Sequence, residues 1–154
     1  MKDQGFFCKC IRCREAGLSR KNTPSELLKL YIEKYDSSGG RETFISFDDK
    51  DETIYGFLRL RKPSELAHRN EIIPNSCIVR ELHVFGKSIK IGDREKNGIQ
   101  HSGLGRKLMS EAEKISKENF DAKKLLVISA VGTREYYKKL GYSLDGPYMS
   151  KQLR

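Results

Sequence analysis

Tryptophan is absent from this sequence of 154 residues, and cysteine and proline are rare, with four of each. No apolar run approaches the roughly 20 residues that span a bilayer, and the first residues form no apolar signal-peptide segment. These absences argue against a membrane-spanning protein and against a secreted disulfide scaffold, and we expect a cytoplasmic protein. Seven phenylalanines and seven tyrosines remain, enough with the aliphatic residues for one hydrophobic core.

Acidic residues are outnumbered, because 21 Asp and Glu stand against 30 Lys and Arg, a net charge of +9. An excess of this size favours a polyanionic partner, either a nucleic acid or a phosphate-rich cofactor. The alternative is an ordinary basic protein whose charges are only solvated. With no tryptophan, no tryptophan platform is available for stacking on bases.

The hydrophobic pattern predicts a mixed sheet with one buried β-α-β unit, in the order β β β β α β α β β. Leu28, Leu30 and Ile32 recur with the period of two that is typical of a strand. Further strands are expected over residues 43–47, 54–60, 77–85, 125–128, 142–144 and 148–152. An amphipathic helix is expected from about residue 103 to 119, and a shorter helix after Thr133.

Residues 1–23 differ in kind from the rest of the chain, and we expect them to form an arm on a domain of residues 24–154. The arm holds three of the four cysteines and a cluster of basic residues. Basic side chains can neutralise phosphates of a nucleic acid backbone. The candidates for RNA binding are Arg12, Arg14, Arg20 and Lys21. The alternative is a solvated charged arm with no role in RNA binding.

The cysteine spacing predicts a metal site. Cys8, Cys10 and Cys13 lie within one tight turn, and Cys77 is the remaining cysteine. Four thiolates make the closed tetrahedral site that structural zinc prefers, and basic neighbours favour the thiolate form. We therefore expect one zinc ion held by all four. The alternatives are free thiols, a disulfide pair, or His68 as the fourth ligand.

Residues 100–105, with the sequence QHSGLG, open the expected long helix. The two glycines let the backbone turn tightly and leave room for a ligand. The free N–H groups of the first helical turn suit an anion, and Arg106 and Lys107 add positive charge. The turn is therefore a candidate pyrophosphate site. The alternative is a glycine-rich helix start that binds nothing.

The pattern Gln-x-x-Gly-x-Gly resembles the acyl-CoA-binding signature of GNAT acetyltransferases. Residues 137–142 are similar to that family's second signature, a tyrosine four positions before a glycine and then an aromatic residue. The order of the expected elements also agrees. The resemblance implies the GNAT fold, an α/β (mixed α+β) structure whose mostly antiparallel sheet is flanked by helices. It also implies acetyl-CoA as the bound molecule.

Longer blocks resemble the family of Elongator catalytic subunits, which are tRNA wobble-uridine acetyltransferases. The blocks are CKCIRCRE at 8–15, GFLRLRK at 56–62, IVRELHVFG at 78–86, VGTREYY at 131–137 and GPYM at 146–149. The likeness runs from residue 8 to residue 153, and the absence of extra loops is similar to archaeal members. The resemblance implies a zinc site in the arm and tRNA as a partner.

Members of that family carry a radical-SAM domain, with an iron–sulfur cluster and S-adenosylmethionine, before the acetyltransferase domain. The Cys-x-x-x-Cys-x-x-Cys motif of that domain is absent from this sequence. The resemblance therefore implies an acetyltransferase domain alone, with the radical-SAM domain of the full-length protein as its partner. We expect it to bind acetyl-CoA and to hydrolyse it when tRNA binds, but not to form the carbon–carbon bond to the uridine by itself.

The resemblance also places acetyl-CoA between the fourth strand and the glycine-rich turn. The implied contacts are Glu81, Leu82, His83, Val84, Gln100, Gly103, Leu104, Gly105, Arg106 and Tyr137. By this resemblance Tyr137 occupies the position where the GNAT family often has its general acid, and a phenol with a pKa of about 10 can protonate the leaving thiolate. Glu81 and His83 share one strand face and are candidates for the base, although either could simply face solvent. Tyr136 is expected to pack into the core.

Three functions are compatible with these features. The first is the tRNA-modifying acetyltransferase domain, which supplies the acetyl group for carboxymethylation of the wobble uridine. The second is a protein (histone) lysine acetyltransferase. The third is a non-enzymatic, zinc-stapled module that binds tRNA and senses acetyl-CoA. The basic arm favours RNA over histone tails, which are themselves basic, and the two intact acyl-CoA signatures argue against the third function.

Overall fold

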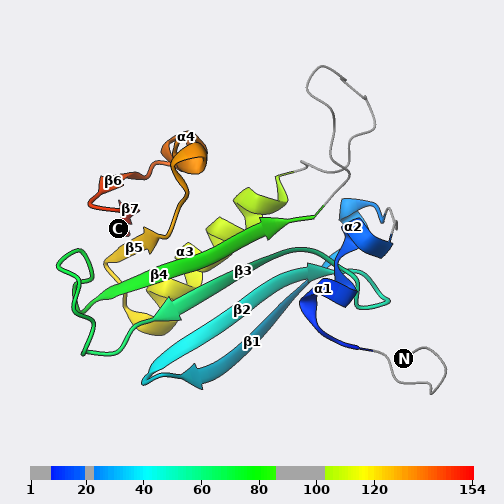
Figure 1. The fold of residues 1–154 in the computed structure, drawn as a ribbon, viewed down its shortest axis with the longest axis horizontal. Coiled ribbons are helices and arrows are strands. Elements are labelled where there is room, and N and C mark those ends of the chain that lie inside the picture. The colour runs from blue at the N-terminus through cyan, green and yellow to red at the C-terminus, as the bar shows by residue number, and fades with distance from the viewer. Residues whose placement is uncertain (1–7, 20–22, 86–102) are drawn as a thin grey trace.

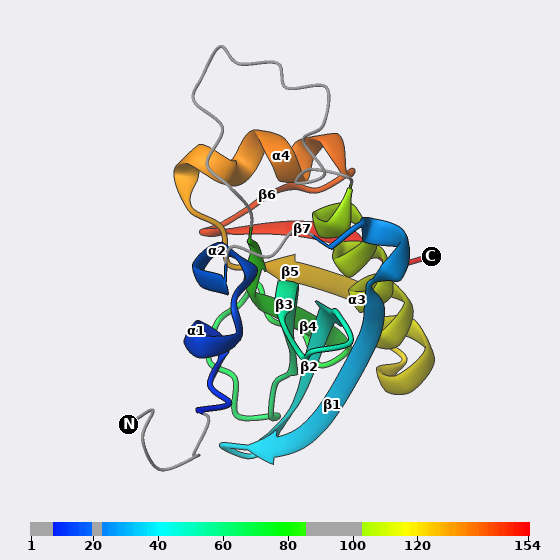
Figure 2. The same ribbon diagram turned by 90° about the vertical axis from the view of Figure 1, so that its right-hand side faces the viewer.

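The computed structural model describes residues 8–19, 23–85 and 103–154. Seven strands form one sheet in the order β1-β2-β3-β4-β5-β7-β6, with α3 against one face (Figures 1 and 2). The strands are β1 (Lys29–Ser37), β2 (Gly40–Asp48), β3 (Ile54–Lys62), β4 (Ser76–Val84), β5 (Lys124–Val127), β6 (Ser143–Asp145) and β7 (Tyr148–Gln152). The helices are α1 (Ile11–Arg14), α2 (Ala16–Ser19), α3 (Leu104–Phe120) and α4 (Arg134–Lys139), with the 3-10 turns η1 (Ser25–Leu27) and η3 (Val131–Thr133).

The first four strands form an antiparallel meander, as the alternating pattern predicts. β1 and β2 are joined by a two-residue turn in which Ser38 and Gly39 have φ of 48° and 68°. Positive φ at both central residues is the type I′ geometry, which matches the twist of the flanking strands. The turn sets the register by placing Ser37 opposite Gly40.

The second half of the sheet contains the expected β-α-β unit. β4 leads through α3 to β5, which pairs with β4 in parallel. The apolar stripe of α3 packs on the sheet, with Leu108, Met109 and Ala112 all nearly inaccessible to solvent. All four residues of β5 are buried, as expected for a strand covered on both faces. None of the described helices has the length and apolarity that a bilayer crossing requires.

The side chains of β1 are more exposed than the alternating pattern of a half-buried strand predicts. Leu30 and Ile32 are 39% and 43% exposed. The physical reason is position, because β1 is the edge of the sheet and α3 packs on β2, β3 and β4. The alternation correctly indicates a strand, but whether a neighbouring element covers its apolar side depends on the tertiary arrangement.

Candidate acyl-CoA site and metal-binding arm

β4 and β5 are neighbours over only part of the length of β4. Their pairing runs from Ser76 opposite Lys124 to Val79 opposite Val127, and the Ile128 N–H donates to the Val79 carbonyl at 2.9 Å. β4 then continues over residues 80–84, beside which no described residue of β5 is paired. Backbone groups that β4 directs to this side can therefore bind a ligand. This opening contains the strand positions 81–84 that were expected to face the cofactor.

α3 begins beside the end of β4, because Leu104 and Val84 belong to one apolar cluster. Gly103 is the N-cap, with φ of 78°, and no side chain caps the helix. The Lys107 N–H donates to the Gly103 carbonyl at 2.9 Å, so the N–H groups of the three residues before Lys107 have no partner within the helix. The first turn holds no acidic residue, and Arg106 is exposed there. This helix start suits an anion such as a pyrophosphate. Gln100, the other expected contact in this turn, lies outside the described residues.

Gly105 allows α4 to approach the start of α3. A Cβ atom at Gly105 would lie 2.7 Å from the Tyr136 hydroxyl oxygen and 3.6 Å from Cγ2 of Val84. Tyr136 is 39% exposed, so the expectation that it packs into the core is wrong. Burial raises the pKa of Tyr136 and the charge of Arg106 acts in the opposite direction. Tyr136 thus lies beside the start of α3 at the candidate site, rather than in the core as expected from the sequence.

Tyr137 is the buried member of the tyrosine pair, with 6% of its surface exposed. Its ring packs edge-on against Tyr136 and Tyr142, with centroid distances of 5.1 and 6.1 Å. Burial raises the pKa of Tyr137 to about 12, so the phenol keeps its proton at neutral pH. Within the described residues this phenol has no hydrogen-bond partner, which leaves its proton available for a bound ligand.

Glu81 and His83 lie on the face of β4 that points away from α3. The His83 Nε2 atom is 3.1 Å from a Glu81 oxygen, and the other Glu81 oxygen is 3.5 Å from the Arg59 guanidinium. The His83 ring stacks on Phe57 at 5.3 Å. The two base candidates therefore share a face and contact each other. Leu82, on the opposite face, packs against the main core.

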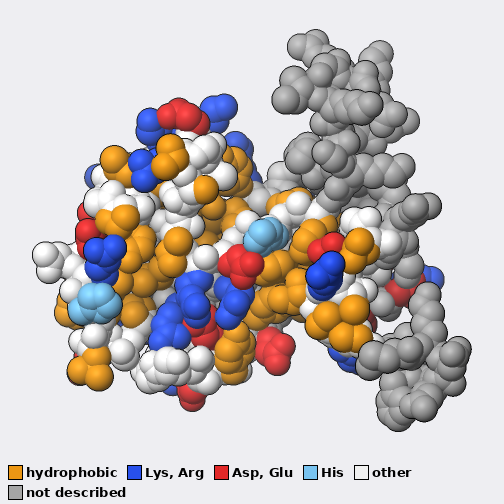
Figure 3. Space-filling view, in the orientation of Figure 1, with side chains coloured by type: hydrophobic (Ala, Val, Ile, Leu, Met, Phe, Trp, Pro, Cys, Tyr) orange, Lys and Arg blue, Asp and Glu red, His pale blue; other side chains and the backbone are white. Residues whose placement is uncertain are grey.

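The same face carries a buried ionic group on neighbouring strands. Glu42 is 1% exposed, and one of its oxygens accepts hydrogen bonds from Arg61 at 2.7 Å and Arg80 at 2.6 Å. Burial alone would raise the pKa of Glu42, but these two bonds hold it below its usual value. Figure 3 shows this face, where Lys and Arg side chains gather in the middle of the sheet beside acidic groups and a histidine.

Cys8, Cys10 and Cys13 converge at the exposed end of the arm, with their sulfur atoms within 4.8 Å of one another. α1 produces this convergence, because the Cys13 and Arg14 N–H groups both donate to the Cys10 carbonyl. The backbone of Cys13 and the neighbouring thiols hold the pKa of Cys10 below its usual value, whereas Cys10 and Cys8 raise that of Cys13 to about 11. Three converging thiols form a donor set that fits zinc.

Cys77 does not join this group, which corrects the prediction that it is the fourth ligand. Its side chain is fully buried in the main core, and the Ser116 hydroxyl contacts its sulfur. The arm meets the sheet at Ile54, the first residue of β3, through a backbone bridge from Glu15. Cys77 lies at the other end of β3, where the pairing of β3 with β4 ends near Lys62. At about 3.3 Å per residue, the length of β3 separates the two by roughly 25 Å.

The arm is fixed to the β2–β3 turn by charge. Arg14 pairs with Asp48 at 2.5 Å and donates to the Glu52 carbonyl at 2.7 Å, and Lys9 pairs with Glu52 at 3.3 Å. Arg14 is therefore engaged within the protein, which argues against its expected role in RNA binding. Arg12 is exposed on α1. The other two candidates, Arg20 and Lys21, lie outside the described residues.

Beyond α1 the arm packs against the candidate acyl-CoA site. Ala16 is 5% exposed and shares a cluster with Tyr55 and Leu104, the first residue of α3. Val84, at the end of β4, packs against the same cluster. The arm therefore supports both elements that border the opening, although its cysteines lie on the surface.

Replacing Arg14 with alanine should lower the free energy of unfolding by about 3 kcal/mol, because it leaves the carboxylate of Asp48, whose side chain is 6% exposed, without its cation. Urea denaturation measures the change. Arg12→Ala is the matched control, since it removes an exposed arginine from the same helix. Equal stability of the two variants would show that the Arg14–Asp48 pair does not hold the arm.

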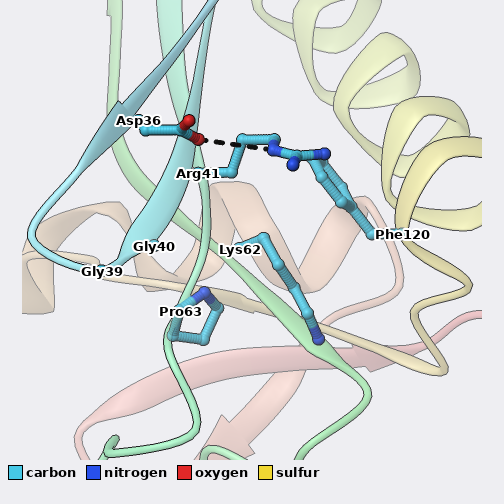
Figure 4. A pocket seen from close by; sticks show the side chains of 7 residues that line it. All are labelled: Asp36, Gly39, Gly40, Arg41, Lys62, Pro63 and Phe120. Carbon is cyan, nitrogen blue, oxygen red and sulfur yellow. Dashed lines mark ion pairs between the residues drawn. The ribbon is translucent and has the colours of Figure 1, made fainter.

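The far end of the sheet holds a separate pocket of about 440 Å³ (Figure 4). It is lined by the β1–β2 turn, the end of β3 and Phe120 at the end of α3. Its charged groups already have partners: Arg41 lies 3.5 Å from Asp36, and the Lys62 ammonium donates to the carbonyls of Pro74 and Ser76. The candidate acyl-CoA site lies at the opposite end of α3.

No protein-family model matches the sequence. The chain is 48% identical over 157 residues to Elongator complex protein 3 of Dictyostelium discoideum, and 46% identical over 159 residues to tRNA uridine(34) acetyltransferase of Methanocaldococcus jannaschii. Both alignments cover 99% of this chain, but only 28% and 29% of those relatives. The chain thus spans under a third of the length of the curated relatives that it matches.

Solved structures agree with these matches. The archaeal Methanocaldococcus infernus Elp3 with an N-terminal deletion superposes with a TM-score of 0.87 at 47% identity, covering 99% of this chain and 37% of that chain. The spermidine/spermine N-acetyltransferase SpeG of Vibrio cholerae superposes with a TM-score of 0.51 at 12% identity over 83% of this chain and 95% of its own, which shows the fold alone. The GNAT fold is confirmed, and the chain belongs to the Elongator complex protein 3 family.

Proposed function

We propose that this chain is an acetyl-CoA-dependent acetyltransferase domain that supplies the acetyl group for modification of the wobble uridine of tRNA. The observation that carries the proposal is the opening between β4 and β5, where α3 presents unpaired N–H groups beside Tyr136. An acyl-CoA needs an anion site for its pyrophosphate and a strand edge for its amide-bearing arm. The relative named tRNA uridine(34) acetyltransferase supports tRNA as the substrate.

Several residues at the opening have separate roles in the proposed hydrolysis of acetyl-CoA. The helix start at residues 104–106 binds the pyrophosphate, and the free side of residues 81–84 binds the pantetheine amides. Glu81 or His83 accepts a proton from the attacking water, whose oxygen bonds to the acetyl carbon as the carbon–sulfur bond breaks. Tyr137 donates its proton to the leaving thiolate, and solvent restores it. In the full reaction the uridine would bond to the acetyl methyl carbon, after radical-SAM chemistry supplied by the further length of the relatives removes a hydrogen from that carbon, and water would still break the carbon–sulfur bond to leave the carboxymethyl group.

We further propose that the cysteine arm holds a structural zinc ion through Cys8, Cys10 and Cys13, and that Arg12 contacts tRNA phosphates. The convergence of three sulfur atoms supports the first assignment. The exposure of Arg12 beside the metal ligands supports the second. The fourth zinc ligand would be a group other than Cys77, because that thiol is fully buried in the core.

Purified protein should contain about one zinc per chain. Cys10→Ser should lose it, because two thiolates bind zinc much more weakly than three. Cys77→Ser is the matched control and should keep its zinc while losing stability, since it places a hydroxyl among apolar residues. Metal analysis and thermal unfolding separate the two effects. Loss of zinc from a folded Cys77→Ser protein would restore Cys77 to the site.

The proposed function is tested by measuring acetyl-CoA hydrolysis alone, with tRNA and with a histone peptide. Stimulation by tRNA alone is the expected result. Acetylation of the peptide without any effect of tRNA would favour a lysine acetyltransferase instead. Binding of tRNA and acetyl-CoA with no hydrolysis would favour a non-enzymatic module.

A further inference from the structure

The outer edge of β1 is unpaired within the described part of the chain. β1 ends the sheet and is paired through residues 29–37 with β2 on its inner side. Figures 1 and 2 show it as a long strand at the margin of the molecule. A long regular edge exposes backbone N–H and C=O groups that can pair with another strand.

The β1–β2 turn determines which residues present those groups. In a two-residue hairpin the closing pair, here Ser37 and Gly40, exchanges hydrogen bonds, and bonded pairs then alternate along the ladder. The odd-numbered residues of β1 therefore bond to β2. The residues whose N–H and C=O groups point outward are Leu30, Ile32, Lys34 and Asp36.

Apolar side chains on this strand are exposed on both faces of the sheet. Leu30 and Ile32, 39% and 43% exposed, lie on the α3 side, since Ile32 is opposite the core residue Ile45. Tyr31 and Tyr35, 48% and 40% exposed, lie on the other side. Such side chains gain most from a strand that continues the sheet, because it covers both faces at once.

We propose that β1 pairs antiparallel with β1 of a second copy of this chain, about a two-fold axis at Ile32. A symmetric pairing that keeps each side chain on its own face must place even residues opposite even ones. A register centred on Ile32 pairs residues 29–35, one centred on Glu33 pairs residues 29–37, and one centred on Lys34 pairs residues 31–37. The last two place two glutamates or two lysines directly opposite each other, which is destabilising.

The register centred on Ile32 has no such conflict. The two Ile32 residues face each other and exchange backbone hydrogen bonds, since their polar groups point outward. On the α3 face, Leu30 lies against the stem of the second copy's Lys34. On the other face, Tyr31 lies opposite the second copy's Glu33, which can accept from its phenol. Lys29 lies opposite the second copy's Tyr35 and diagonal to its Glu33, an attractive pairing.

This register places no like charges opposite each other and sets Lys29 diagonal to the second copy's Glu33, which is why the proposed occupant is a second copy rather than an unrelated strand. The contact is one strand edge with its flanking side chains, so the dimer is weak and depends on concentration. The two copies join into one continuous sheet with both α3 helices on the same face.

Sedimentation velocity over a range of protein concentrations tests the proposal. The parent chain should show a monomer–dimer equilibrium. Ile32→Lys and Ile32→Glu should each weaken it about tenfold or more, because each places like charges on the two-fold axis. Mixing the two variants should restore dimers, since opposite charges then face each other. Such rescue requires Ile32 to lie on the axis.

Ile73→Lys is the matched control, because Ile73 is 40% exposed on the loop before β4 and away from the edge. It should dimerise as the parent does, and circular dichroism should show that all variants are folded. A parent chain that stays monomeric at every concentration would overturn the proposal. Dimers that persist unchanged in Ile32→Lys, or variants that fail to associate when mixed, would also overturn it.

Discussion

Replacing Gly105 with glutamate should abolish acetyl-CoA binding. The new carboxylate would stand at the start of α3, where free N–H groups and Arg106 otherwise attract the pyrophosphate. It would also displace Tyr136, because a Cβ at this position lies 2.7 Å from the Tyr136 hydroxyl oxygen. Isothermal titration with acetyl-CoA measures the loss, and thermal unfolding shows whether the fold survives.

Gly105→Ala separates the steric effect from the charge. It adds the Cβ alone, and we expect acetyl-CoA affinity to fall about ten- to a hundredfold, which corresponds to the roughly 1–3 kcal/mol that overpacking costs. Gly17→Ala is the matched control, because a Cβ there meets no atom within 4 Å. Full affinity in Gly105→Glu would mean that the pyrophosphate binds elsewhere and that the helix start is not the acyl-CoA site.

The order of strands and helices could be predicted because each element carries a local signal. The apolar stripe of α3 and the continuous apolar run of β5 each have one interpretation once their length is known. The anion-binding role of the glycine-rich turn could also be predicted, since two glycines at the start of a helix leave the N–H groups of its first turn accessible to a ligand. These features position the opening between β4 and β5, so most of the candidate site follows from the sequence.

The errors concern residues whose surroundings come from distant parts of the chain. α4 spans six residues, too few for an apolar stripe to show which of Tyr136 and Tyr137 faces the core. Tyr137 faces the core because it packs against Tyr142, and Tyr136 lies at the start of α3 because Gly105 has no side chain there. Cys77 likewise lies in an apolar strand, and the local sequence around a metal-ligating cysteine there would not differ from that around a buried core cysteine. Its burial depends on α3, which no local pattern reveals.

The two adjacent tyrosines should have separable effects on acetyl-CoA hydrolysis. Tyr137→Phe keeps the ring and removes the phenol proton, so turnover should fall about a hundredfold while acetyl-CoA affinity changes little, as expected for a general acid. Tyr136→Phe should do the opposite. Its hydroxyl lies at the start of α3, so its loss should weaken acetyl-CoA binding and leave turnover nearly unchanged.

Each variant is the control for the other, because both remove one hydroxyl from the same helix. Calorimetric titration gives affinity, and a thiol-release assay gives turnover. The pH profile adds an independent readout. With its pKa raised to about 12 by burial, Tyr137 should stay protonated well above pH 10, and turnover should show no alkaline loss from this group below that pH. Equal turnover in Tyr137→Phe and the parent would show that water, or another group, protonates the leaving thiolate.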